Sequence, residues 1–249
     1  MNASDAGIPS DIRSLSAVVP VRDEVGSLAG LLSELDLALG GLDLTLEWVF
    51  VDDASSDGSR ALLQSWMEKD PRLRLLVLPE WSGQSAALDA GLRGARGDAV
   101  VMLDADGQND PADIPALLRG LQDADVVSGV RVGRNDRWLR RWSSRVANAV
   151  RRMALRDDVT DIGCSLRVVR SRYVRRLKLY GGMHRFLPVL LAIEGARLAE
   201  QPVNHRPRRT GRSKYGIGNR LLPALADLFA VAWMQRRAIR RRASEQERP

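Results

Sequence analysis

The sequence predicts an α/β fold in which a mostly parallel sheet is flanked by helices. Short apolar, β-branched runs alternate with amphipathic helical patterns up to about residue 130, and this alternation is typical of right-handed βαβ units. Several apolar runs also end abruptly in polar residues, as in VVMLDADGQND at 100–110. Because ligands bind beyond the carboxyl ends of parallel strands, these ends are the predicted site.

The elements follow in chain order. Apolar runs predict strands at 16–21, 46–53, 73–79, 98–106 and 124–130. Helical spacing between them predicts helices at 25–39, 59–69, 85–95 and 113–121. The second half predicts a long basic helix at 137–155, a strand at 164–169, two helical segments, a strand at 196–205, a polar loop at 206–216 and a last helix from about 219 to 242. We expect one domain over 1–216 and a basic amphipathic helix over 217–249.

The chain has 249 residues and is 45% hydrophobic, which is enough for one large core. From Gln201 onward it has 12 Lys and Arg against three acidic residues, so this segment carries +9 while the whole chain carries +7. Such a local surplus favours an anionic partner, either a phospholipid surface or nucleic acid. Regularly placed aromatics for base stacking are absent, which argues against nucleic acid. The single Cys164 excludes an intramolecular disulfide framework and is compatible with a reducing cytoplasm.

The residues that end the first two predicted strands indicate which reactions and ligands the site suits. The first ends in PVRDEVGS rather than in a glycine-rich turn, which argues against a dinucleotide-binding domain and hydride transfer. The second ends in VFVDDASSDGS, where Asp52 and Asp53 could accept hydrogen bonds from a base N–H and ribose hydroxyls. Ser55 and Asp57 serve equally well as caps of the following helix.

The fourth strand ends in LDADGQND, with Asp104 and Asp106 on the same side of the chain. Two neighbouring buried carboxylates are unfavourable unless a cation compensates them. A hard divalent ion could bind Asp106 and share the phosphate oxygens of a nucleotide. Asp110, directly before Pro111, is better interpreted as the start of the next helix.

Five motifs together resemble the inverting GT-A glycosyltransferases of family 2, and more narrowly the polyprenyl-phosphate branch that includes dolichol-phosphate mannose synthases. The similarity covers about 16–216 and implies a Rossmann-like GT-A fold. The motifs are VVPVRDE (18–24), VFVDDASSDGS (49–59), SGQSAALDAGLRGARGDAVVMLDADGQNDP (82–111), DIGCSLRVVRS (161–171) and HRPRRTGRSKYG (205–216).

The resemblance implies roles for the matching residues. It implies a nucleoside-binding edge made of Pro20, Arg22, Glu24, Asp52 and Asp53, with Gln84 beside the nucleotide. It implies a D-x-D pair, Asp104 on the donor side and Asp106 on the metal, and it implies that Gln108 helps to hold Mg²⁺ or Mn²⁺. It implies an acceptor side that contains Asp161 and Arg167, and acceptor-phosphate contacts from Arg131, Arg134, Arg140 and Ser144. It implies a phosphate-closing loop that contains Arg206, Arg208, Ser213 and Lys214.

The implied reaction moves a sugar from a UDP- or GDP-linked donor to polyprenyl phosphate and supplies a lipid-linked sugar for cell-envelope glycan or lipopolysaccharide modification. A metal on Asp106, together with Arg208 and Lys214, would stabilise the leaving pyrophosphate. Polyprenyl phosphate is already anionic and needs no base. A glycan hydroxyl acceptor, the first alternative, needs a carboxylate base, for which Asp161 is the best candidate. The second alternative is a non-catalytic membrane-bound adaptor.

The last helix contains Leu, Phe, Val and Trp and ends in a cluster of arginines. This pattern is typical of a helix lying on anionic lipid. An ordinary packing helix with a solvated tail is the alternative. Many proteins of the resembling family continue into transmembrane helices, whereas this chain stops after its last amphipathic helix. We therefore expect a monotopic enzyme at the cytoplasmic face of the bacterial inner membrane. A membrane partner subunit or a homo-oligomer is left open. The two histidines, His184 and His205, are not expected to form a metal pair, and His184 is expected to cap or pack.

Overall fold

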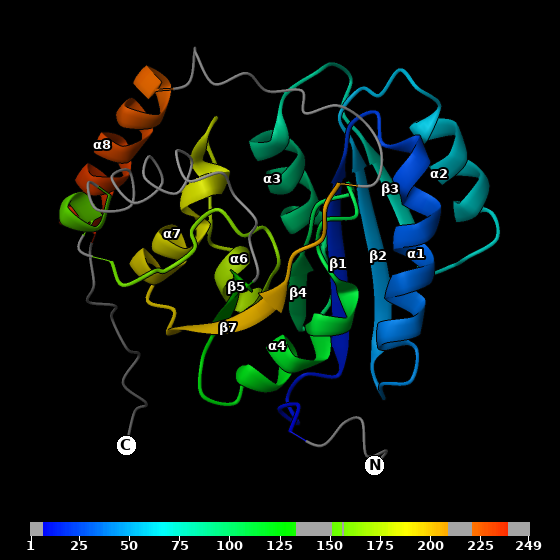
Figure 1. Ribbon diagram of the computed structural model, residues 1–249, viewed down its shortest axis with the longest axis horizontal. Helices are drawn as coiled ribbons and strands as arrows, with labels where there is room; N and C mark the ends of the chain where they lie inside the picture. The colour runs from blue at the N-terminus through cyan, green and yellow to red at the C-terminus, as the bar shows by residue number, and fades with distance from the viewer. Residues whose placement is uncertain (1–6, 133–150, 156, 209–220, 239–249) are drawn as a thin grey trace, which may run out of the picture.

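The computed structural model describes residues 7–132, 151–155, 157–208 and 221–238, which form helical layers around a sheet (Figure 1). Within these residues seven strands pair in the order β3-β2-β1-β4-β6-β5-β7. All pairings are parallel except those of β6, which runs antiparallel to β4 and β5. The strands are β1 (Ser14–Val21), β2 (Thr45–Asp52), β3 (Leu73–Val77), β4 (Ala99–Met102), β5 (Val126–Val132), β6 (Arg167–Arg170) and β7 (Leu198–Asn204).

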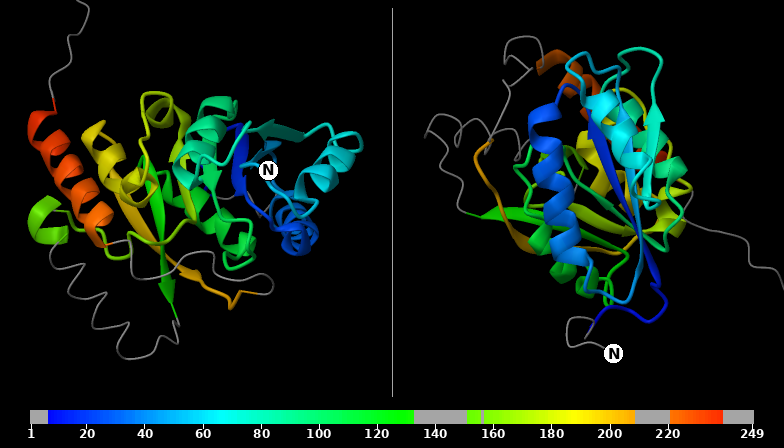
Figure 2. Two further views of the ribbon diagram at one scale, coloured as in Figure 1. Left: turned by 90° about the horizontal axis from the view of Figure 1, so that it is seen from above. Right: turned by 90° about the vertical axis from the view of Figure 1, so that its right-hand side faces the viewer.

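Helices cover both faces of this sheet (Figures 1 and 2). One face carries α1 (Val25–Leu39), α2 (Ser59–Met67), the 3-10 turn η2 (Pro111–Asp113) and α4 (Ile114–Gly120). The other carries α3 (Gln84–Gly94), α6 (Ser171–Val174), the 3-10 turn η3 (Met183–Phe186), α7 (Leu187–Ile193) and α8 (Leu221–Arg237). The predicted fold class, a mostly parallel sheet flanked by helices with a C-terminal helix, is confirmed.

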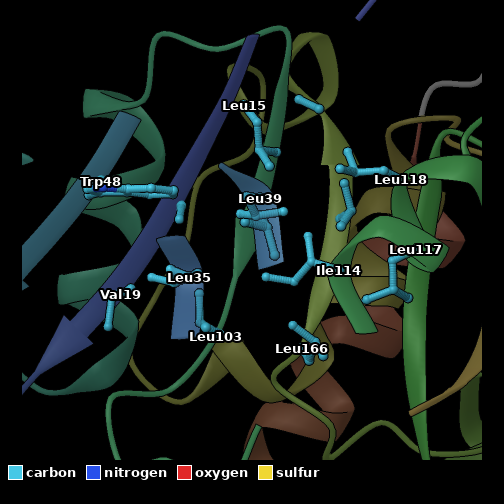
Figure 3. Close-up of a cluster of buried hydrophobic side chains, with 14 of the residues drawn as sticks. Leu15, Val19, Leu35, Leu39, Trp48, Leu103, Ile114, Leu117, Leu118 and Leu166 are labelled. Atoms are coloured by element: carbon cyan, nitrogen blue, oxygen red, sulfur yellow. The ribbon is translucent and has the colours of Figure 1, made fainter. Parts of the chain in front are cut away.

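Two clusters of buried apolar side chains hold these layers to the sheet. The first lies between the sheet and the α1 and α4 layer, and Figure 3 shows Leu35 and Leu39 of α1 near Ile114 of α4 and near Trp48 of the sheet. Trp48 is fully buried. The second cluster joins α3, α7 and α8 on the opposite face. The continuous apolar runs of β1 and β4 supply side chains to both clusters, as expected for strands covered on both faces.

The second half differs in detail from its predicted elements. The strand predicted at 164–169 begins later, at Arg167. Of the helix predicted at 137–155, residues 151–155 are helical and the remainder lies outside the described residues. The last helix occupies 221–237, and its buried residues Leu228, Val231 and Ala232 join the second cluster. Among the described residues, no helix has the length and apolar character needed to cross a membrane.

Candidate active site

The candidate site lies where β1, β2 and β4 end at one edge of the sheet. These strands are parallel neighbours, so their carboxyl ends lie together. A cavity of about 230 Å³ opens there. Eight of the residues implied by the resemblance line it: Pro20, Arg22, Glu24, Asp53, Gln84, Asp104, Asp106 and Arg208.

Asp53 is the ordered carboxylate of the nucleoside-side wall. Its Oδ1 accepts the backbone N–H of Ser82 at 2.7 Å, and its Oδ2 accepts that of Gly83 at 2.9 Å. Gly83 has φ +85°, a left-handed conformation that favours glycine. Arg22 donates through Nη1 to the carbonyl oxygen of Asp53. The loop before α3 is thereby fastened to the end of β2.

Asp52 does not line the cavity, although the resemblance placed it on the nucleoside edge. Its side chain is fully buried and turns toward α2, where its Oδ2 accepts from Arg60 Nε at 2.7 Å. Its Oδ1 accepts the backbone N–H of Ser55 at 3.3 Å. Successive side chains of a strand point to opposite sides, which is why Asp52 and Asp53 separate.

The two carboxylates of the D-x-D pair both face the cavity. Gln84 Nε2 donates to Asp104 Oδ1 at 2.8 Å, and Asp106 Oδ1 accepts the backbone N–H of Gln108 at 3.1 Å. Burial raises the pKa of the Asp104 carboxyl, and the negative charge of Asp106 raises this pKa further. Within the described part of the chain, the surroundings of Asp104 therefore disfavour its charged form.

Such a pair fits a divalent cation. Of the cationic side chains that the structure describes, Arg208 is the one that forms an ion pair with Asp106, at 4.0 Å from Oδ2, and its guanidinium is also paired with Glu24. Among the described residues, no group of three or more His, Cys, Asp or Glu side chains converges as a ready-made metal site. A metal held by Asp106, with help from Gln108 as the resemblance implies, would take further oxygens from the substrate or water, as Mg²⁺ does in phosphate sites.

Gln108 does not line the cavity and lies beside His205 and Arg206, which follow β7. Its Nε2 is 3.4 Å from His205 Nε2 and donates to the carbonyl oxygen of Arg206 at 3.3 Å. Arg206 forms ion pairs with Glu34 at 2.7 Å and with Asp110 at 2.6 Å. Arg206 therefore fastens the β7 end to α1 and to the loop after β4 rather than lining the cavity.

Asp110 is a helix cap, as predicted. Its carboxylate accepts the backbone N–H of Ala112 at 3.1 Å, at the start of η2. The three carboxylates of the 100–110 stretch are thus divided between a pair at the cavity and one capping residue.

The acceptor-side residues gather next to the cavity. Arg131 holds Asp161 through two hydrogen bonds, Nε to Oδ2 at 2.7 Å and Nη2 to Oδ1 at 2.8 Å. Arg167 is buried, and this burial lowers its pKa to about 10. It borders a second cavity of about 70 Å³ that Asp104 also lines. The remaining residues of this prediction and of the phosphate-closing loop lie outside the described residues: Arg134, Arg140, Ser144, Ser213 and Lys214.

The contacts that Asn109 and His184 make at the site were not predicted from the sequence. The side chain of Asn109 is buried, and its Oδ1 accepts from the backbone N–H of Asp104 at 3.0 Å and from Ser165 Oγ at 2.9 Å. His184 Nδ1 lies 2.7 Å from Ser85 Oγ. Asn109 stands inside a matching motif and could have been found there. The contact of His184 spans 99 residues, and no local pattern indicates it.

The architecture and the cavity define a class of protein, the GT-A glycosyltransferase fold. Two solved structures share it. A mannosyltransferase from Pyrobaculum calidifontis, in complex with GDP-Man and Mn²⁺, gives a TM-score of 0.62 at 22% identity over 90% of this chain and 74% of that chain. Glucosyl-3-phosphoglycerate synthase from Mycobacterium tuberculosis, in complex with Mn²⁺, UDP-Glc and phosphoglyceric acid, gives 0.68 at 18% identity over 93% and 82%.

The particular family follows from the sequence comparison. Residues 16–178 match the model of glycosyl transferase family 2, and the chain belongs to this family. The expected family is thereby confirmed.

Relatives within the family are more similar to this chain in sequence than the two solved structures are. A dodecaprenyl-phosphate galacturonate synthase from Rhizobium johnstonii is 34% identical over 92% of this chain and 69% of the relative. Undecaprenyl-phosphate 4-deoxy-4-formamido-L-arabinose transferases are similar: the enzyme from Edwardsiella ictaluri is 36% identical over 83% of this chain, and that from Pseudomonas paraeruginosa is 38% identical over 88%. The chain spans 64% and 65% of the length of these two relatives.

Proposed function

We propose that this protein is an inverting glycosyltransferase that moves a sugar from a UDP- or GDP-linked donor to polyprenyl phosphate, for use in modification of the cell envelope. The observation that carries the proposal is the convergence of Asp53, Asp104, Asp106 and Arg208 on one cavity at the strand ends. The polyprenyl-phosphate relatives support the acceptor class.

A divalent cation, Mg²⁺ or Mn²⁺, is part of the proposal. Bound at Asp106, it would supply positive charge for the leaving nucleoside diphosphate. Asp104 would contact the donor, with its orientation held by Gln84. Arg208, placed at the same cavity, adds a fixed cation beside the phosphates. Lys214 is assigned to the same task on the resemblance alone.

The acceptor side favours a phosphate over a glycan hydroxyl. A hydroxyl acceptor needs a general base, and Asp161 was the candidate. Both oxygens of that carboxylate accept hydrogen bonds from Arg131, which stabilise its charged form and weaken it as a base. A polyprenyl phosphate oxygen is already anionic and requires no proton removal.

We propose further that α8 lies on the cytoplasmic face of the inner membrane. Leu228, Val231 and Ala232 face the core, while Phe229 and Trp233 are 69% and 63% exposed. Arg236 and Arg237 close the helix. Exposed aromatics beside cationic side chains suit an interface with anionic lipid. Residues 217–249 would then form a membrane-contacting segment on a catalytic domain of residues 1–216.

The decisive experiment is an assay with polyprenyl phosphate, Mn²⁺ and a panel of UDP- and GDP-sugars, followed by mass analysis of the lipid product. We expect a lipid-linked monosaccharide with one donor. Glycan acceptors with free hydroxyls form the comparison arm. Product formed on those acceptors alone would support the alternative, and no lipid product with any donor would refute the proposal.

A further inference from the structure

Helix α3 begins inside the candidate site, and its first turn is held from two sides of the cavity. Gln84, the first residue of the helix, donates to Asp104 at 2.8 Å. The backbone N–H of Gly83, just before it, donates to Asp53 at 2.9 Å. The position of this turn therefore sets where Gln84 lies relative to Asp104.

A third contact comes from the acceptor side. Ser85 is 5% exposed, and its Oγ lies 2.7 Å from His184 Nδ1. The same Oγ accepts the backbone N–H of His184 at 3.3 Å. The hydroxyl can both accept the backbone N–H and share a hydrogen bond with Nδ1, so two contacts join Ser85 to His184.

His184 stands between two hollows of the site. It borders the cavity of about 70 Å³ that contains Asp104 and Arg167. It also borders a groove beside the loop that leads into α3. The imidazole thus lies beside the first turn of α3, next to the Gly83 that Asp53 holds.

The segment that carries His184 is itself fitted against α8. Gly182 has φ +81°, and a Cβ built on it would lie 2.2 Å from Asp227 Oδ2 of α8. The close approach of that carboxylate requires glycine. Met183 and Phe186, on either side of His184, are buried, so the segment is packed against its neighbours.

We propose that His184 is a positioning residue that holds Ser85, and through it the first turn of α3, so that Gln84 keeps Asp104 oriented toward the donor. The inference rests on the proposed function and deepens it. Misplacement of a reacting group by about 1 Å lowers turnover on the order of 100-fold, so loss of this support should be visible in kcat.

The test is a double-mutant cycle in the full chain with His184→Leu, Ser85→Ala and the combined variant. We expect each single variant to lower kcat about 10- to 100-fold, and the combined variant to be no worse than the more affected single. The Kd of Mn²⁺ and UDP, measured by calorimetry, should change about twofold or less because the nucleoside wall is untouched. Ser65→Ala on α2, whose hydroxyl donates to the carbonyl oxygen of Leu62 at 2.8 Å, is the matched control.

Two polar variants of His184 distinguish a positioning role from direct contact with the substrate. His184→Asn keeps a polar atom near Nδ1 and should recover most of the lost kcat, whereas His184→Gln, polar near Nε2, should not. Normal kcat in Ser85→Ala combined with a loss in His184→Leu would overturn the proposal, as would rescue by Gln instead of Asn. If the wild type makes no lipid product, the proposed function fails, and the same cycle is read from hydrolysis of the UDP-sugar in Mn²⁺.

Discussion

Gln84 and Asp104, which are 20 residues apart, meet through a 2.8 Å hydrogen bond across the mouth of the candidate site. Gln84 begins α3 and Asp104 follows β4, so the bond joins a helix start to a strand end. It holds one oxygen of a carboxylate whose pKa is raised by burial. Folding disfavours the charged form of this carboxyl, and carboxyls with perturbed pKa values are typical of functional sites.

Asp106→Asn should lower kcat about 100-fold or more, because the carboxylate proposed to hold the metal is lost. The concentration of Mn²⁺ at half-maximal activity should rise. A titration of Mn²⁺ against turnover measures both. Asp123→Asn, in an exposed turn, is the control for the change of charge. Full activity of Asp106→Asn at saturating Mn²⁺ would contradict the metal assignment.

Asp104→Asn should stabilise the protein while lowering its activity. Folding raises the pKa of the Asp104 carboxyl, so this group lowers the free energy of unfolding as the pH rises from its ordinary pKa through the raised one. Asn removes that charge and keeps an oxygen for Gln84. The free energy of unfolding should therefore exceed that of the wild type at neutral pH, and the difference should vanish in acid. Urea unfolding at several pH values measures it, and an equal difference at every pH would contradict this account.

Asp161→Asn distinguishes the two acceptor classes. If no general base is needed, kcat with polyprenyl phosphate should stay within about tenfold of wild type, whereas loss of a base costs about 100- to 10,000-fold. Asp161→Ala should also destabilise the fold by about 2 kcal/mol, because the half-buried Arg131 loses its ion pair with this carboxylate. Stability and kcat are measured on both variants. A large loss of kcat at unchanged stability would contradict transfer without a general base and would assign Asp161 a direct part in the reaction.

Phe229→Ser combined with Trp233→Ser should weaken binding to anionic vesicles about tenfold or more, since two aromatic side chains would no longer leave water. Vesicle sedimentation at low and high salt measures the partitioning. Leu37→Ser is the matched control because Leu37 is 88% exposed on α1, at a distance in sequence and in the fold from α8. Equal partitioning of the double variant and the control would remove the interfacial role of α8.

Gly91→Ala should destabilise the fold by about 1–3 kcal/mol. A Cβ at Gly91 would lie 2.4 Å from Val18 Cγ1 of β1, so α3 would have to move off the sheet. Because α3 carries Gln84 and Ser85, kcat should fall as well. Gly41→Ala, where nothing lies within 4 Å of the added Cβ, should leave both quantities near wild type. Thermal unfolding and turnover measure the pair, and equal behaviour of the two variants would contradict close packing of α3.

The sequence by itself determined the α/β layers and the edge that carries the site. Apolar runs on both sides of helical patterns predict buried parallel strands, and their polar ends therefore meet. Asp53, Asp104 and Asp106 could be named in this way because each directly follows an apolar strand. The family was also accessible, since five motifs stand in order along the chain.

Only the tertiary structure decided which polar side chains share the cavity. Asp52 and Asp53 point to opposite sides of the strand end, but only the packing of α2, which brings Arg60 to Asp52, shows that Asp53 is the one at the cavity. Arg131 closes on Asp161 across 30 residues, and His184 reaches Ser85 across 99. Such contacts depend on how helices and loops pack on the finished sheet, and no local periodicity encodes them. The sequence therefore located the site, and packing determined which groups support it.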